Sequence, residues 1–237
     1  SMPIGAYAEK QIMPEDKLVP VPDGVSSEVA SCITLKGITA EYLLHRAYPL
    51  KKGDKVLYHA AAGGLGQILC PWANAIGAEV IGTVGSKEKE EIAKKNGCHH
   101  VINYTDTNFV EEVEKIVGKN GIDVVYDGVG AKTFEGSIEV LKIRGMMVAF
   151  GNASGYVDTI DVKKHINAKG LFFTRPSIAH YTVTRKELEE SAKKVFEAVL
   201  AGKFKIEISK KYNLEDARKA HEDLEGRKLT GPAVILP

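Results

Sequence analysis

An apolar run, Lys55–His59, leads directly into the glycine-rich stretch Gly63-Gly64-Leu65-Gly66, and this junction most constrains the fold. The residues after it, Gln67–Ile76, have the pattern of a helix. Gly63 lets the backbone approach a phosphate, and Gly66 lets strand and helix pack closely. The helix N-terminus offers free N–H groups to an anion. The junction therefore predicts a pyrophosphate cradle, with Ala61 in place of the first glycine of the usual dinucleotide fingerprint. An ordinary glycine-rich turn is the alternative.

Short apolar runs alternate with amphipathic runs of about ten residues, which predicts βαβ units and a parallel sheet. The apolar runs carry no polar face, as expected of strands buried between two helix layers. We therefore predict an α/β fold with a doubly wound parallel Rossmann sheet. The predicted strands are 55–59, 79–84, 100–103, 122–127, 146–150 and 171–174, and the helices are 64–76, 87–96, 108–118 and 133–141.

Further glycines gather just after the predicted strand ends. In a doubly wound sheet the carboxyl ends of the strands share one edge, where ligands bind. Turns between strands and helices favour glycine in any case, but four such turns at one edge favour a ligand crevice. These glycines are Gly85, Gly128, Gly130, Gly151 and Gly155, in addition to those at 63–66.

The two ends of the chain have a different pattern and predict a second lobe built from both. Before the sheet we expect short strands at 6–12 and 17–20 and a helix at 26–48. After it, a helix at 184–201 begins with the capping box Thr184-x-x-Glu187. A strand at 204–209, a helix at 214–224 capped by Asn213, and a strand at 233–236 complete the expected elements.

The composition is that of an ordinary globular chain of 237 residues, with 44% hydrophobic and 27% charged residues and a net charge of +1. This charge gives no reason to expect nucleic acid or an acidic membrane as a partner. No apolar run is long enough to span a bilayer, and no secretory signal opens the sequence. Three separated cysteines fit a reducing cytoplasm better than a disulfide framework.

The end of the second predicted strand indicates which dinucleotide binds. NAD-binding turns usually have an acidic residue about twenty positions after the glycines, and here none ends the strand. Ser86 can donate a hydrogen bond to a 2′-phosphate, and Lys87 and Lys89 add positive charge, so we predict NADP(H). The alternative is that both lysines lie on a solvated helix face, paired with Glu90 and Glu91.

Other reactive side chains do not combine into a predicted catalytic or metal site. The triplet Cys98-His99-His100 alternates its faces in an extended chain and cannot converge on one ion. His59, at a strand end, is expected to bond to backbone rather than to donate a proton. Tyr104 and Tyr126 lie at or near strand ends and are expected to be half-buried packing residues; contact with the cofactor is the alternative. No Ser/His/Asp triad can be argued, and we predict no catalytic side chain.

Seven stretches make this sequence similar to one family. It resembles the quinone oxidoreductase (zeta-crystallin-like) branch of the medium-chain dehydrogenase/reductase superfamily, and the resemblance extends over the whole chain. The stretches that carry it are Leu35-Lys36-Gly37-Ile38-Thr39-Ala40-Glu41-Tyr42-Leu43-Leu44, His59-Ala60-Ala61-Ala62-Gly63-Gly64-Leu65-Gly66, Ile81-Gly82-Thr83-Val84-Gly85, Val101-Ile102-Asn103-Tyr104, Val124-Val125-Tyr126-Asp127-Gly128-Val129-Gly130, Phe150-Gly151-Asn152-Ala153-Ser154-Gly155 and Thr174-Arg175-Pro176-Ser177.

The resemblance implies an NADPH-dependent, zinc-free, cytoplasmic reductase that passes a hydride to a quinone or to an activated alkene, and that forms a homodimer through the edges of its sheets. It also implies cofactor contacts. The pyrophosphate would bind at Gly64, Leu65 and Gly66, and the 2′-phosphate at Ser86, Lys89 and Tyr104. The rest of the dinucleotide would contact Val129, Gly151, Asn152, Ser154, Thr39, Phe173, Thr174, Arg175 and Arg227.

The resemblance also implies domain limits. Residues 36–175 would be the NADP-binding Rossmann domain, while 1–35 and 176–237 would be parts of a GroES-like catalytic lobe. About 90 residues that relatives carry before Gly5 are absent from this sequence, nearly a small domain's worth. We therefore expect hydride transfer to be impaired. The alternative function is a non-catalytic NADPH-binding fragment with a structural or RNA-associated role, although no basic stripe supports RNA.

Overall fold

The structure is a computed structural model that describes residues 5–226, 228–229 and 231–237. The chain forms two compact units. One consists of Ala40–Ser177, and the other combines the described residues up to Thr39 with Ile178–Pro237. Helix α1 (Ser27–Tyr42) begins in the latter unit and ends in the former.

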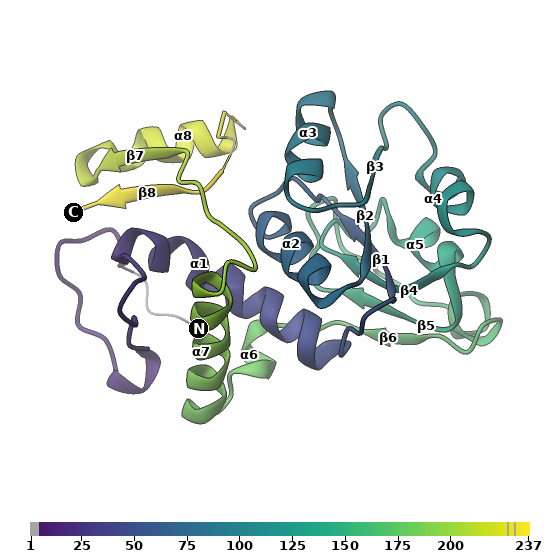
Figure 1. Ribbon diagram of the computed structural model, residues 1–237, viewed down its shortest axis with the longest axis horizontal. Helices are drawn as coiled ribbons and strands as arrows, with labels where there is room; N and C mark the ends of the chain where they lie inside the picture. Colours follow the sequence, from purple (N-terminus) through teal and green to yellow (C-terminus); the bar gives the residue numbers. More distant parts are fainter. Residues whose placement is uncertain (1–4, 227, 230) are drawn as a thin grey trace. The chain divides into compact units, whose positions relative to one another are not determined.

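The unit formed by Ala40–Ser177 contains a six-stranded parallel sheet with the strand order β3-β2-β1-β4-β5-β6 (Figure 1). The order runs outward in both directions from β1 and β4, which defines a doubly wound sheet and confirms the predicted fold class. The strands are β1 (Lys55–His59), β2 (Glu79–Val84), β3 (His100–Asn103), β4 (Ile122–Asp127), β5 (Leu141–Ala149) and β6 (Phe172–Thr174).

Helices cover both faces of this sheet. Helices α2 and α3 lie on one face, and α4 and α5 lie on the other (Figure 1). Neighbouring residues of a strand point to opposite faces, and Val56 and Leu57 of β1 are both fully buried. The central strands β1, β2 and β4 are therefore buried on both faces, as predicted. The helices are α2 (Gly66–Ile76), α3 (Lys87–Lys95), α4 (Phe109–Val117) and α5 (Phe134–Val140), with a π-helical turn η3 (Val162–Asn167) before β6.

Strand β5 begins five residues earlier than the sequence predicted. Leu141 pairs with Ile122, but the next pair is Met146 with Val124, so the intervening residues bulge out of the ladder. Within the bulge Arg144 adopts a positive φ of 59°, and its N–H donates to the Lys169 carbonyl at 2.8 Å. The bulged residues lack an apolar strand pattern, which is why the sequence placed the start of the strand after them.

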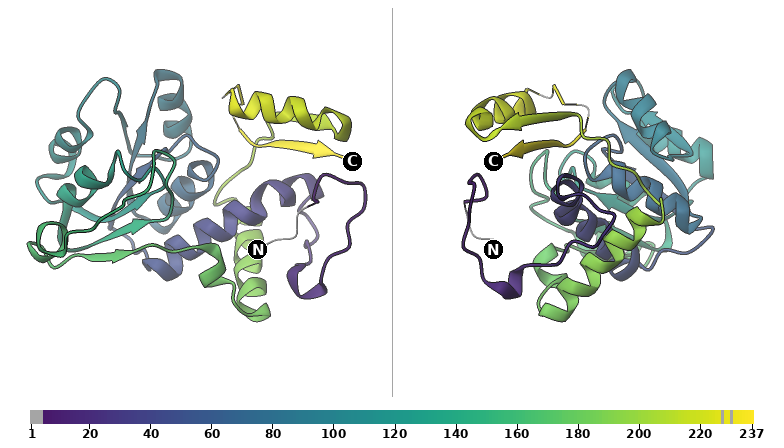
Figure 2. Two further views of the ribbon diagram at one scale, coloured as in Figure 1. Left: turned by 180° about the vertical axis from the view of Figure 1, so that it is seen from behind. Right: turned by 60° about the vertical axis from the view of Figure 1, so that its left-hand side comes forward.

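The other unit is mainly helical, with one small parallel sheet. Its long helix α7 (Arg185–Leu200) begins with the predicted capping box, in which Thr184 and Glu187 bond to each other's backbone N–H groups. Helix α1 passes α7 so closely that a β-carbon at Gly37 would lie 2.4 Å from the Val195 side chain. Strands β7 (Lys210–Asn213) and β8 (Ala233–Leu236) pair in parallel, with α8 (Ala217–Glu225) beside them (Figure 2). Shorter turns are η1 (Glu15–Lys17), α6 (Ile178–Tyr181) and η4 (Leu214–Asp216).

Four predictions for the ends of the chain were wrong. Residues 6–12 and 17–20 form no strand in the described part of the chain; within the second of these, Pro20 lacks the N–H group that a ladder needs. The strand expected at 204–209 lies at Lys210–Asn213 instead, and Phe204 is buried. Asn213 precedes η4 but makes no side-chain cap.

Tyr126 anchors the segment after α1 to the centre of the sheet. It was expected to be half-buried, but its side chain on β4 is fully buried. Its hydroxyl donates to the carbonyl of Leu43 at 3.0 Å and lies 3.4 Å from that of Tyr48. Leu43 opens the π-helical turn η2 (Leu43–Ala47), so this hydrogen bond joins the turn to the sheet.

We predict that Tyr126→Phe lowers the free energy of unfolding by about 1 kcal/mol, because it removes the hydroxyl donor and leaves the buried Leu43 carbonyl with only the Tyr48 N–H. Urea denaturation measures the change. Tyr58→Phe is the matched control: Tyr58 is also a buried strand tyrosine, and its hydroxyl has no hydrogen-bond partner among the described residues. Equal losses in the two variants would contradict the anchoring role.

Candidate functional site

The turn between β1 and α2 has the geometry of an anion cradle. A β-carbon at Gly66 would lie 2.2 Å from the Ala61 carbonyl oxygen, so only glycine allows strand and helix to approach this closely. Ala60 opens the turn with a positive φ of 64°. Helix α2 starts at Gly66, two residues after the predicted start, and no side chain caps it. Among the described residues, the N–H groups of Gly64, Leu65 and Gly66 find no acceptor, so they are available to an anion.

A second candidate site lies where β2 and β3 end side by side. Val84 pairs with Asn103, so the residues that follow the two strands are neighbours. The Tyr104 hydroxyl would be only 2.6 Å from a β-carbon at Gly85, which places the tyrosine ring over that glycine. Ser86 precedes α3 without using its side chain as a cap. The structure thus brings together Tyr104 and Ser86, two of the three residues predicted to bind the 2′-phosphate.

Lys89, the third of these residues, is exposed in the first turn of α3. In the part of the chain that the structure describes it makes no ion pair, whereas Lys94 on the same helix pairs with Glu91 at 2.9 Å. The pairing proposed for Lys87 and Lys89 in the alternative interpretation is therefore absent from the described residues. The first turn also carries Glu88 and Glu90, which reduce its positive charge.

Two further turns, after β4 and after β5, are joined by backbone hydrogen bonds. The N–H groups of Ala153 and Ser154 donate to the carbonyls of Gly128 and Val129 at 3.3 and 2.8 Å. In the other direction, Ala131 donates to Gly155 at 3.1 Å. Val129 and Ser154, two of the predicted cofactor contacts, are therefore neighbours through their backbones.

Close packing and side-chain hydrogen bonds fix the remaining predicted contacts of these turns. A β-carbon at Gly151 would lie 2.4 Å from the Gly128 carbonyl oxygen, so this position requires glycine. The backbone carbonyl of Asn152 accepts a hydrogen bond from the Gly155 N–H. The Ser154 hydroxyl donates to Val129 and accepts from the Lys132 N–H, so it holds the two turns together.

Beneath these turns lies a buried polar network that the sequence analysis did not predict. His59 hydrogen-bonds the Thr83 hydroxyl through Nδ1 and the Ser137 hydroxyl through Nε2, both at 2.9 Å. The hydroxyls of Ser137 and Thr133 reach the Asp127 carboxylate at 3.3 and 2.7 Å. None of these five side chains is more than 8% exposed.

The signal for this network was present in the sequence pattern. Thr83, His59 and Asp127 lie at or next to the ends of three neighbouring strands, and they share a face with the buried residues Ile81, Leu57 and Val125. The prediction that His59 bonds to backbone was wrong, because its partners are side chains. Burial lowers the pKa of His59, and the Asp127 carboxylate partly opposes this shift. The imidazole is therefore neutral at neutral pH.

His59, Ser137 and Asp127 do not form a nucleophilic triad. The serine lies between the other two residues, whereas a triad places the histidine between the serine and the carboxylate. Ser137 is also completely buried, so no substrate can reach its hydroxyl. No catalytic side chain is identified in this network.

The residues of the Cys98-His99-His100 triplet diverge. Cys98 is buried, His99 accepts the Val80 N–H at 3.0 Å, and His100 lies 3.1 Å from Glu79. No group of three or more His, Cys, Asp or Glu side chains could hold a metal ion within the described residues. All three cysteines of the chain are free.

The remaining predicted contacts lie in different parts of the chain. Thr39 lies on α1, where its hydroxyl donates to the Leu35 carbonyl at 2.9 Å. Phe173 and Thr174 end β6 and are partly buried, and Arg175 follows them and is exposed. Arg227 lies outside the described residues. No helix in the described chain has both the length and the apolar character needed to cross a membrane.

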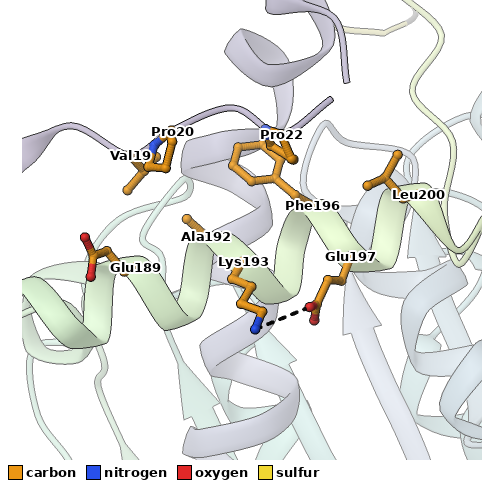
Figure 3. Close-up of a pocket in the computed structure, with 9 residues that line it drawn as sticks. All are labelled: Val19, Pro20, Pro22, Glu189, Ala192, Lys193, Phe196, Glu197 and Leu200. Atoms are coloured by element: carbon orange, nitrogen blue, oxygen red, sulfur yellow. Dashed lines mark ion pairs between the residues drawn. The ribbon is translucent and has the colours of Figure 1, made fainter. Parts of the chain in front are cut away.

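An apolar pocket of about 400 Å³ lies in the other unit, between the segment 19–22 and α7 (Figure 3). Phe196 and Leu200 supply its apolar wall, and Lys193 and Glu197 pair at its rim at 3.8 Å. None of the predicted cofactor residues lines this pocket.

Comparison with known proteins gives consistent matches. Residues 64–199 match the family described as zinc-binding dehydrogenase. The chain is 45% identical over 238 residues to a 2-haloacrylate reductase of Burkholderia sp and 44% identical over 237 residues to a quinone oxidoreductase of Salmonella typhimurium. In both cases the alignment covers 99% of this chain and 72% of the relative.

A solved structure extends the match to three dimensions. The Escherichia coli quinone oxidoreductase complexed with NADPH has a TM-score of 0.93 and 42% sequence identity. The match covers 100% of this chain and 73% of that structure.

Proposed function

This chain belongs to the zinc-binding dehydrogenase family, in the quinone oxidoreductase branch of the medium-chain dehydrogenase/reductases, and on that basis we propose that it binds NADPH and reduces quinones or activated alkenes. The general class, an oxidoreductase, follows from its relatives. The choice of acceptor, the independence from zinc and the cytoplasmic location are further parts of the proposal. The free cysteines support a reducing compartment.

The observation that carries the proposal is the β1–α2 turn. Its three available N–H groups and the missing β-carbon at Gly66 fit a diphosphate that lies against the backbone. Gly151 supplies a second place where a β-carbon has no room, on the joined turns after β4 and β5. The residues present therefore fit a dinucleotide laid along the carboxyl edge of the sheet.

The chain's own residues bind and orient the cofactor in this proposal. When bound, NADPH supplies the hydride chemistry. Gly64, Leu65 and Gly66 donate N–H groups to the diphosphate, and the turn at Val129 contacts the dinucleotide beyond it. Phe173, Thr174 and Arg175 would contact the nicotinamide. Positioning thus replaces acid–base catalysis, and solvent protonates the product.

The preference for NADPH over NADH rests on the end of β2. No carboxylate follows the strand directly, where it would accept the ribose hydroxyls of NAD. The Tyr104 and Ser86 hydroxyls instead provide donors at this position, and Lys89, which has no ion-pair partner among the described residues, provides charge. These three groups suit a 2′-phosphate.

We expect the chain to oxidise NADPH when a simple benzoquinone is added, followed as the loss of nicotinamide absorbance. Tight NADPH binding without turnover would instead favour the alternative, a non-catalytic NADPH-binding module. Failure to bind NADPH at all would contradict both functions. The heat-denatured chain corrects for direct reaction between NADPH and the quinone.

We predict that Lys89→Glu weakens NADPH binding by about tenfold or more and leaves NADH binding nearly unchanged, because only NADPH carries the 2′-phosphate. Fluorescence titration with each nucleotide measures both affinities. Lys186→Glu, on α7 in the other unit, makes the same charge change and should alter neither. Equal weakening of both nucleotides by Lys89→Glu would show that Lys89 is only a surface lysine.

We also propose a homodimer formed through the edge strand β6. Strand β6 ends the sheet and leaves one side of its ladder unpaired among the described residues. Phe172 on β6 and Ile143 in the bulge of β5 are 59% and 67% exposed, which adds an apolar surface near this edge. Light scattering should give twice the mass of the chain, and a monomer would contradict the proposal.

A further inference from the structure

We propose that His59 and Ser137 are positioning residues, which hold the Asp127 carboxylate and through it the β4–α5 turn in the shape that receives a dinucleotide. Neither side chain touches the cofactor in this inference. It rests on the proposed function and adds to it a buried network that controls the turn from below. Four observations carry it.

The Asp127 carboxylate determines the shape of the turn. Its Oδ1 accepts the N–H groups of Val129 at 2.7 Å and Gly130 at 3.0 Å. Its Oδ2 accepts the hydroxyls of Thr133 and Ser137. One oxygen therefore holds the turn and the other is held by the start of α5, so a change on the helix side is transmitted to the turn.

The acceptors around Ser137 favour one direction for the hydrogen bonds of the network. Ser137 carries one hydroxyl proton, which has two acceptors, the Thr133 carbonyl at 2.8 Å and the Asp127 carboxylate at 3.3 Å. When that proton goes to one of these two acceptors, the serine oxygen accepts from Nε2–H of His59. Nδ1 is then the unprotonated nitrogen of the neutral ring, and it accepts from the Thr83 hydroxyl. We therefore infer that His59 is the tautomer protonated at Nε2.

His59 joins the two turns that the cofactor would contact. It is the last residue of β1 and directly precedes Ala60, the first residue of the β1–α2 turn. Its ring is 1% exposed and packs edge-on against Phe109 of α4 with 5.0 Å between the ring centroids. The ring therefore has a fixed orientation, and it links β1 to β2 through Thr83 and to α5 through Ser137.

The β4–α5 turn cannot easily adopt a second shape with the same contacts. Gly130 has a φ of +92°, and a β-carbon there would lie 2.5 Å from the Gly155 carbonyl oxygen. Loss of a hydrogen bond below the turn would therefore loosen it or shift it against the turn after β5. Val129, at the tip, is the predicted contact with the dinucleotide.

The first test measures the tautomer in the unmodified chain, without any nucleotide. Nitrogen NMR of the histidine rings should show His59 neutral and protonated at Nε2 at neutral pH. His59→Gln identifies its signals by their disappearance. A ring protonated at Nδ1, or a charged ring, would overturn the inference whatever the cofactor.

The second test separates positioning from general loss of structure. Ser137→Ala leaves Nε2–H without an acceptor, and it should weaken NADPH binding about tenfold. Adenosine 2′,5′-bisphosphate contains only the half of the ligand that would bind Ser86, Lys89 and Tyr104. Its affinity should change by less than about twofold, because a local change in the β4–α5 turn does not reach that site. Ser191→Ala, a buried serine on α7, is the control and should alter neither affinity.

The outcomes distinguish this inference from the proposed function. If the unmodified chain and Ser137→Ala bind NADPH equally, the inference fails and the proposed function stands. If Ser137→Ala weakens both ligands alike, the residue supports the fold in general and the inference also fails. If the unmodified chain does not bind NADPH, the proposed function fails and the inference fails with it. Should Ser137→Ala not fold, the tautomer in the unmodified chain decides.

Discussion

The candidate site depends on the parallel pairing of β1 with both β2 and β4. Because all three strands run in the same direction, their carboxyl ends lie at one edge, and the turns that follow them become neighbours. His59 pairs directly with Thr83 in this register, and Tyr58 pairs with Tyr126, one residue before Asp127. A shift of one residue would turn these polar side chains to the opposite face of the sheet. The register therefore decides both the position of the turns and the formation of the network beneath them.

Burial makes this arrangement demanding, since a buried polar group without a partner costs about 1–3 kcal/mol. In this protein the buried polar side chains of the network form hydrogen bonds with one another and with the backbone of the β4–α5 turn. Asp127 is completely buried, and four donors surround its carboxylate. His59 uses both ring nitrogens. The buried polar side chains of the network therefore keep hydrogen-bond partners inside the apolar core. Their main effect is to fix the geometry of the strand ends and turns, more than to add stability.

The sequence predicted those parts of the fold that follow from local patterns. Strands such as Lys55–His59 and Ile122–Asp127 were predicted with their observed bounds, because a run that is apolar on both faces has few alternatives. The capping box at Thr184 was equally local. The strands expected at 6–12 and 17–20 failed, because extended apolar residues form a strand only when a partner lies beside them. The bulge before Met146 was not predicted, for a similar reason. Arg144 takes its conformation from a contact with Lys169, which is distant in the sequence.

The same distinction explains how much of the site was predictable. The glycine turn and the residues Ser86 and Tyr104 were predicted from local spacing and family resemblance. The link from His59 to Ser137 joins residues 78 positions apart, so no local pattern shows it. Even the alignment of Thr83, His59 and Asp127 on one face becomes informative only once the strand order β2-β1-β4 is known.

The two neighbouring turns also satisfy their backbone groups in opposite ways, and this difference suits their separate tasks. In the β1–α2 turn, three consecutive N–H groups have no acceptor within the described chain. In the β4–α5 turn, the Val129 and Gly130 N–H groups are bonded to a buried carboxylate, and its carbonyls are bonded to the next turn. A turn that binds an anion must keep its donors available, because donors already used inside the protein would have to be released first. A turn that supplies shape needs its own groups satisfied, so that a ligand meets one conformation and does not have to order several.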